Sequence, residues 1–376
     1  MAKKINYSLR NFINDIHLWL GLASGIILFL VCLSGTVLAF EHEIKDFFSD
    51  KITVEQPSKE IDIDIDKLVT SLKTSEKGFV TGVTIPSKNN QPYEFQVKKD
   101  IKERRGSIFL MNPYTQEIVK PKTTAADNFM LTMFKLHRWL LLDLKVGRPI
   151  VGVATIIFLI LAISGIILWF PKKLKWKNFK HGLKIKTNAN WKRINHDLHN
   201  TLGFYACIFI VIMGLTGLAW SFDSYREGMG KILGSPLFGK RDAPFEIVKK
   251  DSISKISLNE AIKITNEELN YNGKLSVTFP TAKNAVYQFR KYNSKSWSPE
   301  TADKLTVDIY GNMLKKEIFS KKPLNEQIAT LVKPLHTGSI FGTFSKTIYF
   351  LACLIATSLP ITGTIIWLNK LKKKKV

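Results

Sequence analysis

Four long apolar stretches divide the chain, and polar segments of mixed composition separate them. They cover about residues 18–40, 149–170, 201–222 and 347–368. Each is close to the roughly 20 residues that a helix needs to cross a bilayer, and their interiors contain no Asp, Glu, Lys or Arg, which are costly there. The first stretch is longer than the apolar core of a signal peptide. We therefore expect four transmembrane helices in the lipid bilayer.

The charge pattern gives these helices an orientation. The formal net charge is +24, and the stretch from Lys172 to Arg193 holds nine Lys or Arg and no acid. The N-terminus carries Lys3, Lys4 and Arg10, and the C-terminus reads KLKKKK. Because positive residues collect in cytoplasmic segments, both termini and the basic loop are expected in the cytoplasm of a bacterial inner membrane. This distribution accounts for the charge, so nucleic acid is not expected as a partner.

The apolar stretches repeat one another. A shift of 182 residues places His17 on His199 in the pattern His-x-x-Leu-Gly, and it also superimposes the later Ser/Thr-Gly motifs. The second and fourth stretches share SGIILW (164–169) and TGTIIW (362–367). The fold class we expect is an α-helical membrane protein, with four transmembrane helices as a duplicated two-helix unit.

The two long segments between the helices also resemble each other. Each starts with a helical pattern, DIDKLVTSL or SLNEAIKITNEEL, followed by alternating strand-like runs and a final hairpin. We expect two extracytoplasmic α+β domains without an evident catalytic constellation. The expected order is 1–40 (N-terminal segment and first helix), 41–135 (first periplasmic domain), 136–170 (interfacial segment and second helix), 171–200 (basic loop), 201–222 (third helix), 223–333 (second periplasmic domain), 334–369 (interfacial segment and fourth helix) and 370–376 (cytoplasmic tail).

Six of the seven histidines fall at the expected membrane edges, on two levels. The inner level has His17, His196 and His199, and the outer level has His42, His137 and His336. A single histidine there is ordinary, but a set in repeated contexts indicates ligands. Zinc requires three or four ligands, whereas a b-type haem requires two axial imidazoles and flat apolar space. There is no C-x-x-C-H motif for covalent attachment. We therefore predict two haems b per chain.

Glycines supply the space that a porphyrin needs. Residues four apart share a helix face, so Gly21 lies with His17 and Gly203 lies with His199, although helix–helix packing would also explain these glycines. By helix rise, Gly35 and Gly217 reach the outer level, and Gly165 and Gly363 come near the inner level.

Ligand assignment follows the repeat. His199 matches His17 at the inner level, and His196 remains an alternative because it lies three residues away. At the outer level His137 and His336 share a context, since each follows a Leu and precedes a membrane helix. His42, 25 residues after His17, would lie on the same face of a continuous helix, but it has no counterpart in the second half.

These motifs resemble the PepSY-associated transmembrane-helix family. The matching pieces are HLWLGLASGIILFLVCLSG, LHRWLLL…GRPIVG…ISGIILWF, HDLHNTLGFY…GLTG and LHTGSIFG…ITGTIIWL, and the hairpins MNPYTQEIV and VDIYGNML are similar to the end of a PepSY domain. The resemblance covers nearly the whole chain. It implies PepSY-like outer domains and an inner-membrane di-haem reductase of ferric siderophores, with a role in iron uptake.

Under this hypothesis electrons pass outward and reduce a ferric siderophore or other ferric chelate, releasing Fe(II). Arg138 and Arg148 are placed to meet haem propionates, and Arg104, Arg105, Arg290 and Lys291 could position the chelate. No nucleotide-binding fingerprint occurs in a cytoplasmic segment, so the donor would be a quinol or a separate cytoplasmic reductase. The alternatives are a non-redox, membrane-anchored PepSY binding or regulatory module and, third, a permease component for iron chelates.

Overall fold

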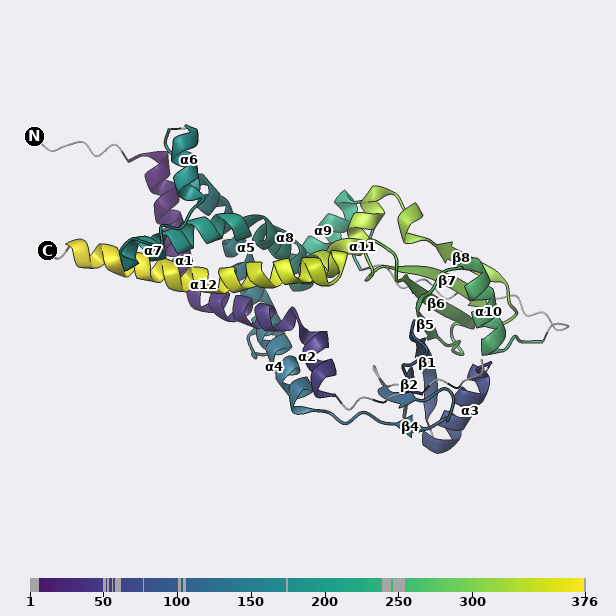
Figure 1. Cartoon of the computed structure of the whole chain (residues 1–376). Helices are drawn as coiled ribbons and strands as arrows, with labels where there is room; N and C mark the ends of the chain where they lie inside the picture. The colour runs from purple at the N-terminus through teal and green to yellow at the C-terminus, as the bar shows by residue number, and fades with distance from the viewer. Residues whose placement is uncertain are drawn as a thin grey trace, which may run out of the picture. The chain divides into compact units, whose positions relative to one another are not determined.

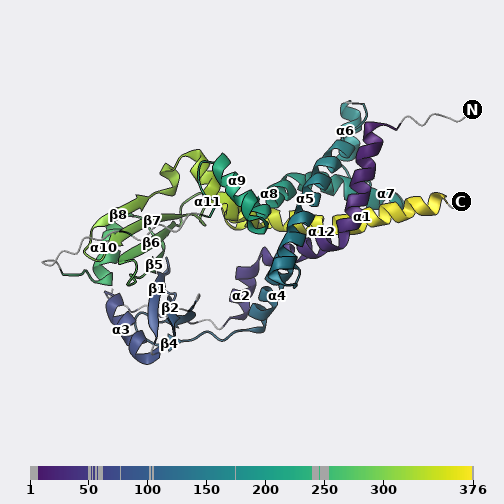
Figure 2. The same cartoon turned by 180° about the vertical axis from the view of Figure 1, so that it is seen from behind.

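The computed structural model describes residues 7–374, apart from 50–51, 53, 56, 58–61, 77, 101–102, 104–105, 174, 239–244 and 246–253. The chain forms two compact units, which we describe separately (Figure 1, and from behind in Figure 2). The helical unit contains residues 1–45, 125–238 and 331–376, and the sheet unit contains 46–124 and 239–330. Arg104 and Arg105, suggested above as chelate contacts, lie outside the described residues.

The helical unit is built on four long helices. They are α1 (Leu9–Leu38), α5 (Leu144–Trp169), α8 (Gly203–Ser221) with the turns before it, and α12 (Thr343–Lys374). Among the described residues, four helical segments are long and apolar enough to cross a membrane: Leu9–Leu38, Leu144–Trp169, Trp191–Ser221 and Thr343–Lys372. Outward-facing residues such as Ile26, 79% exposed, and Ile208, 64% exposed, remain apolar. A helix that is apolar on all faces is typical of a membrane span.

The four helices form a ring in the order α1, α5, α8 and α12, in which each packs on its two neighbours. Their shared core consists of small and medium-sized side chains: Cys32, Ala206, Ile210, Ala352 and Ala356. Small residues let membrane helices approach closely, so that dispersion contacts replace the missing hydrophobic driving force. The core positions the inward faces of all four helices toward one another.

Shorter helices close the two ends of the bundle. At the end with the start of α1 and the end of α12 lie α6 (Trp176–Gly182) and α7 (Trp191–Asp197), which continues through a π-helical turn, η1 (Leu198–Leu202), into α8 (Figure 1). At the other end lie α4 (Ala125–Trp139), α9 (Asp223–Ile232) and the C-terminal part of α11 (Leu324–Thr337), with η3 (Ser339–Phe341) before α12.

The sheet unit repeats one arrangement twice, as the sequence pattern predicts. In the first half α3 (Ile65–Glu76) precedes β1 (Phe79–Ile85), β2 (Tyr93–Lys98), β3 (Ser107–Met111) and β4 (Ile118–Val119). In the second half α10 (Leu258–Glu268) precedes β5 (Gly273–Thr278), β6 (Val286–Asn293), β7 (Ala302–Asp308) and β8 (Met313–Glu317), followed by η2 (Phe319–Lys321).

The two halves share one sheet and one core. Within the described chain the strands form an antiparallel eight-stranded sheet in the order β4-β3-β2-β1-β5-β6-β7-β8. Alternate residues of β2, Tyr93, Phe95 and Val97, are buried and pack with residues of α3 and α10 in a single cluster. A Cβ at Gly82 would lie 2.5 Å from the Val277 carbonyl oxygen, so glycine permits the close β1–β5 pairing.

The helices also join the halves at their N-termini. The Asp66 carboxylate of α3 accepts hydrogen bonds from the Leu258 and Asn259 amides, both at 3.0 Å, and caps α10. In return, Asn259 Oδ1 accepts a hydrogen bond from the Ile65 amide at 3.0 Å. The segments that the sequence suggests as two domains therefore fold as one body, because β1 and β5 would otherwise each present an unpaired edge.

Two sequence expectations change at element boundaries. The geometric argument for His42 is wrong, because α1 ends at Leu38 and a separate helix, α2 (Glu41–Phe48), begins three residues later. The turn at residues 39–40 separates the two helices, so His42 does not continue the face of α1. In addition, α4 and α9, which the sequence assigns largely to outer domains, fall within the helical unit.

Candidate functional site

The structure brings four histidines together as two pairs inside the helical unit. We call His17 and His199 the inner pair and His137 and His336 the outer pair, after the orientation expected from the charges. The ring centres are 6.3 Å apart in the inner pair and 6.1 Å apart in the outer pair. The ring planes make angles of 89° and 54°, respectively. Each pair takes one histidine from each half of the chain.

A Ser-Gly or Thr-Gly motif holds each ring of the inner pair. A Cβ at Gly165 would lie 3.4 Å from His17 Cε1, and one at Gly363 would lie 3.2 Å from His199 Cε1. His17 Nδ1 is 2.9 Å from Ser164 Oγ, and His199 Nδ1 is 2.9 Å from Thr362 Oγ1. Each glycine therefore admits the ring, and the hydroxyl before it meets the ring nitrogen.

These contacts favour one tautomer of the inner pair. The Ser164 hydroxyl donates to the Leu161 carbonyl at 3.1 Å, and the Thr362 hydroxyl donates to the Ser358 carbonyl at 3.0 Å. Since each hydroxyl proton is already used, the oxygen accepts a hydrogen bond from histidine Nδ1–H. The Nε2 atom of each ring then keeps its lone pair, which is the form in which imidazole binds a metal.

The outer pair reaches the same tautomer mainly through the backbone, and His336 Nδ1 also lies 3.1 Å from Thr216 Oγ1. His137 Nδ1 donates to the Val31 carbonyl at 2.9 Å, and His336 Nδ1 donates to the Met213 carbonyl at 3.0 Å. A carbonyl can only accept, so Nε2 again carries the lone pair. A Cβ at Gly35 would lie 3.0 Å from His137 Cε1, and one at Gly217 the same distance from His336 Cε1. These two glycines therefore make room for imidazole rings rather than for a porphyrin.

The geometry of both pairs fits a metal held between two imidazoles. A metal–imidazole nitrogen bond is about 2 Å long and the ring centre lies about 1 Å behind that nitrogen, so rings on opposite sides of one ion have centres roughly 6 Å apart. Within the described ranges, no group of three or more His, Cys, Asp or Glu gathers as a metal site. Each pair thus offers two axial ligands, which is the donor set of a bis-imidazole haem.

A cavity of about 600 Å³ opens beside the inner pair. Its lining includes both histidines, Gly21 and Gly203, each one turn from a histidine, together with apolar residues such as Leu22 and Phe158. The volume is within the range of cofactor sites. Three cations also line it: Arg10, Lys172 and Lys370. The residues present therefore suit a flat apolar group that carries acidic substituents at one edge.

Two arginines without an acidic partner lie near the outer pair. Arg138, adjacent in sequence to His137, and Arg148, in the first turns of α5, are close enough for their charges to repel. Arg148 Nη2 donates to the Trp220 carbonyl, but Arg148 Nε is buried without a hydrogen-bond partner. In the part of the chain that the structure describes, neither arginine forms an ion pair with a carboxylate. An anionic group, such as a propionate, would satisfy them.

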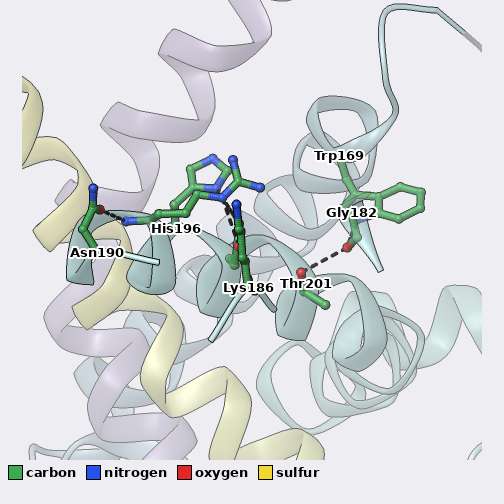
Figure 3. Close-up of polar contacts among 8 residues, drawn as sticks. Trp169, Gly182, Lys186, Asn190, His196 and Thr201 are labelled. Atoms are coloured by element: carbon green, nitrogen blue, oxygen red, sulfur yellow. Dashed lines mark hydrogen bonds and ion pairs between the residues drawn. The ribbon is translucent and has the colours of Figure 1, made fainter. Parts of the chain in front are cut away.

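The basic loop folds back onto the π-helical turn that carries His199. The Gly182 carbonyl accepts hydrogen bonds from Trp169 Nε1 at 3.1 Å and from Thr201 Oγ1 at 3.0 Å (Figure 3). Thr201 is buried within the π-helical turn, where one wider turn redirects the side chains that follow. The loop thereby fixes the segment that aims His199 at His17.

His196 lies outside the inner pair. Its side chain is 52% exposed, and its Nδ1 is 3.5 Å from the Asp197 carboxylate (Figure 3). Asp197 itself is buried and accepts hydrogen bonds from the Lys186 amide and from Arg193 Nε. His196 contributes to the wall of the cavity, whereas the repeat-matched His199 faces His17.

The remaining candidate residues are placed as follows. His42 is exposed on α2 and is not in the outer pair. Lys291 was suggested as a chelate contact, but only 5% of it is exposed, and its Nζ donates to Asn266 Oδ1 and to the Leu269 carbonyl. It anchors the end of α10 to the sheet. Arg290 is exposed on β6.

Sequence reasoning missed the residues that orient the rings. Ser164 and Thr362 belong to the repeated Ser/Thr-Gly motif, so the repeat itself could have identified them. The sequence interpretation used only the glycine of each motif. The carbonyls of Val31 and Met213 leave no trace in a sequence, because every residue has a carbonyl. The π-helical turn at 198–202 also gives no composition signal.

The fold and site together define a polytopic α-helical membrane protein with four apolar helices and two partly buried histidine pairs. Residues 15–370 match the model of the family described as PepSY-associated TM region. The chain therefore belongs to that family, as the sequence motifs indicated. The comparison with curated proteins found no match.

Proposed function

We propose that the protein is an inner-membrane di-haem b oxidoreductase that passes electrons outward to a ferric siderophore or other ferric chelate and releases Fe(II). Both termini would lie in the cytoplasm, and the sheet unit in the periplasm. The observation that supports this proposal most is the presence of two histidine pairs. Their ring centres are 6.3 and 6.1 Å apart, and the Nδ1 atom of every ring makes a hydrogen bond. A bound haem would supply one-electron transfer at each pair.

The chain's own residues would hold and orient the haems. Ser164, Thr362 and the two carbonyls would hold each imidazole by Nδ1 and leave its Nε2 lone pair available to a haem iron. Arg138 and Arg148 would neutralise propionates at the outer pair, and Arg10, Lys172 and Lys370 would do so at the inner cavity. The apolar lining would exclude water. The electron donor would be a quinol or a separate cytoplasmic reductase.

The chemistry at the chelate is a single reduction. A haem held by His137 and His336 would supply the one electron that reduces the chelated Fe(III) to Fe(II). No proton or bond of the protein is involved. Fe(III) prefers hard oxygen ligands more strongly than Fe(II) does, so the reduced metal dissociates more readily.

The first test is a pyridine haemochrome assay on the purified full-length protein. We expect two haems b per chain and a low-spin bis-imidazole spectrum. A folded protein without haem would contradict the proposal and favour a non-redox, membrane-anchored PepSY binding or regulatory module.

The second test separates the ligands. His137→Ala or His336→Ala should remove one of two haems and abolish ferric-chelate reduction, while the inner haem stays reducible. His42→Ala and His196→Ala are the matched controls, because neither ring belongs to a histidine pair, and they should retain two haems. The pairing would be refuted if a control variant lost a haem while His137→Ala kept both.

A further inference from the structure

A chain of aromatic rings extends from the outer pair toward the surface of the helical unit. The Trp220 ring lies against the His336 ring, with centres 5.1 Å apart. Trp220 also contacts Phe238, with ring centres 4.6 Å apart and planes 35° apart. Phe238 is 43% exposed. The three rings thus form a continuous contact from the partly buried His336 imidazole to the surface.

The surroundings hold these rings in place. The Arg148 guanidinium donates to the Trp220 carbonyl, which anchors the end of α8. Phe238 has a φ of +67°, in the left-handed region that costs a non-glycine residue about 1–2 kcal/mol. Such a conformation persists only where the surrounding structure imposes it, and these positions cluster at functional sites. The tilted ring contact with Trp220 is one interaction that stabilises this conformation.

The first half of the chain lacks this arrangement. With the 182-residue shift, Trp220 corresponds to Leu38, an aliphatic residue. Near His137 the closest matching aromatic, Trp139, packs on Phe134 with ring centres 5.8 Å apart. The outer pair is therefore symmetric in its ligands but asymmetric in its connection to the surface.

We propose that electrons leave the outer haem through the His336 side of the bundle, by way of Trp220 to Phe238, and that the ferric chelate accepts them at Phe238. This inference rests on the proposed function. Trp220 shortens the gap that the electron must cross, since π systems in contact replace saturated side chains along the route. The overall change is the one above: one electron moves from ferrous haem to chelated Fe(III), and the aromatic side chains are unchanged at the end.

The chelate arm of the test uses the full-length haem-loaded protein. It is reduced chemically and mixed anaerobically with ferric nitrilotriacetate, and haem reoxidation is followed by stopped-flow absorbance. Trp220→Leu, which installs the residue of the first half, should slow reoxidation about tenfold, because positioning of the redox groups is the contribution of the protein. Trp220→Phe should recover most of the rate. Trp139→Leu, the matched control, should react at the wild-type rate.

A second arm measures the route without any chelate. A ruthenium photosensitiser is attached to Phe238→Cys, and a laser flash injects one electron into the outer haem. Trp220→Leu in this background should slow haem reduction about tenfold, whereas a label at Leu141→Cys, on the first-half side of the outer end, should give a rate that is independent of Trp220. Haem content and the reduction potentials of all variants are recorded, and we expect them to match the parent protein.

The outcomes separate this inference from the proposed function. Wild-type rates for Trp220→Leu in the flash arm, with two haems present, would overturn the route. If Trp220→Leu loses the outer haem, Phe238→Leu replaces it in the chelate arm and should still slow reoxidation; an unchanged rate there overturns the inference. If the wild type carries haem but does not reduce the chelate, the reductase function fails and the flash arm alone decides the route. A wild type without haem overturns both.

Discussion

His137 and His336 are matched residues of the two halves, yet the turns that follow them are built differently. After His137 the chain turns through Leu140 and Leu141, with φ of +55° and +60°. After His336 it turns through Gly338 and Gly342, with φ of +75° and +66°. The first turn is strained for L-residues, whereas the second is not.

The inner histidines differ in a similar way. His17 lies in a regular stretch of α1, whereas His199 lies in the π-helical turn between α7 and α8. Both rings nevertheless face each other, each against a glycine and a hydroxyl of a neighbouring helix. The comparison shows that the two halves place their imidazole rings equivalently, although the backbone conformation at each histidine differs. The predictions below test where this equivalence of the halves holds and where it ends.

The largest effect is expected at the glycines that face the outer pair. Gly35→Leu and Gly217→Leu would each push a side chain into the space of His137 or His336, since even a Cβ would lie 3.0 Å from the ring. Both variants should lose one of two haems, and to the same extent, by pyridine haemochrome assay. Gly228→Leu is the control, because a Cβ there meets nothing within 4 Å. Retention of both haems in either outer variant would contradict the equivalence.

The turns should respond in opposite directions. Gly338→Ala introduces left-handed strain and a Cβ 2.5 Å from Tyr349, so it should destabilise the protein by about 2 kcal/mol or more. Leu141→Gly should relieve strain and leave the stability unchanged or raise it by up to about 1 kcal/mol. Thermal melting of the detergent-solubilised protein, followed by circular dichroism, measures both. If Gly338→Ala instead stabilised the protein, the second turn would not require a residue that tolerates a left-handed φ.

The caps between α3 and α10 should be unequal. Asp66→Ala removes the acceptor of two backbone amides and should cost about 1–2 kcal/mol. Asn259→Ala removes one such acceptor, with an expected cost of about 1 kcal/mol. Amide hydrogen exchange reports each locally: Asp66→Ala should speed exchange at Leu258 and Asn259, and Asn259→Ala should speed it at Ile65. Equal costs would mean that the two halves cap each other symmetrically.

The smallest effect concerns pH and the second half alone. Burial raises the pKa of Glu317, but hydrogen bonds from Lys315 and Lys322, together with the charge of Lys304, outweigh it and lower the pKa to about 2. Because this pKa is below its unfolded value of 4.5, the carboxylate stabilises the sheet above about pH 4.5, and this contribution is lost as the pH falls toward 2. The difference in melting temperature between wild type and Glu317→Gln should shrink over that range. A constant difference would exclude ionisation as its source.

Much of the fold follows from sequence patterns with a clear physical origin. The apolar runs fix the four spans, because length and lack of charge are set by the bilayer. The shift that superimposes His17 on His199 also identifies these two residues as partners, and they form the inner pair in the structure. Helix rise places Gly35 at the level of His137, and their contact follows from that spacing.

What the sequence could not provide depends on backbone atoms and on long-range pairing. The β1–β5 pairing joins segments that are far apart in the chain, and either strand could have been an edge. The Nδ1 partner of His137 is a carbonyl, which carries no sequence signal, and so is one of the two Nδ1 partners of His336, the other being Thr216 of the Thr-Gly motif. The separation of α2 from α1 is decided by the turn at residues 39–40, so the face calculated for His42 from an uninterrupted helix did not apply.

The pairing of β1 with β5 also bears on the order in which the protein can be made. Synthesis delivers α3 and β1–β4 well before α10 and β5–β8, and the second and third long apolar helices, α5 and α8, lie between them in the chain. Until the second segment has been synthesised, β1 has an open edge of the kind that aggregates. The sheet can therefore be completed only after the apolar helices that separate its two halves in the chain have been made.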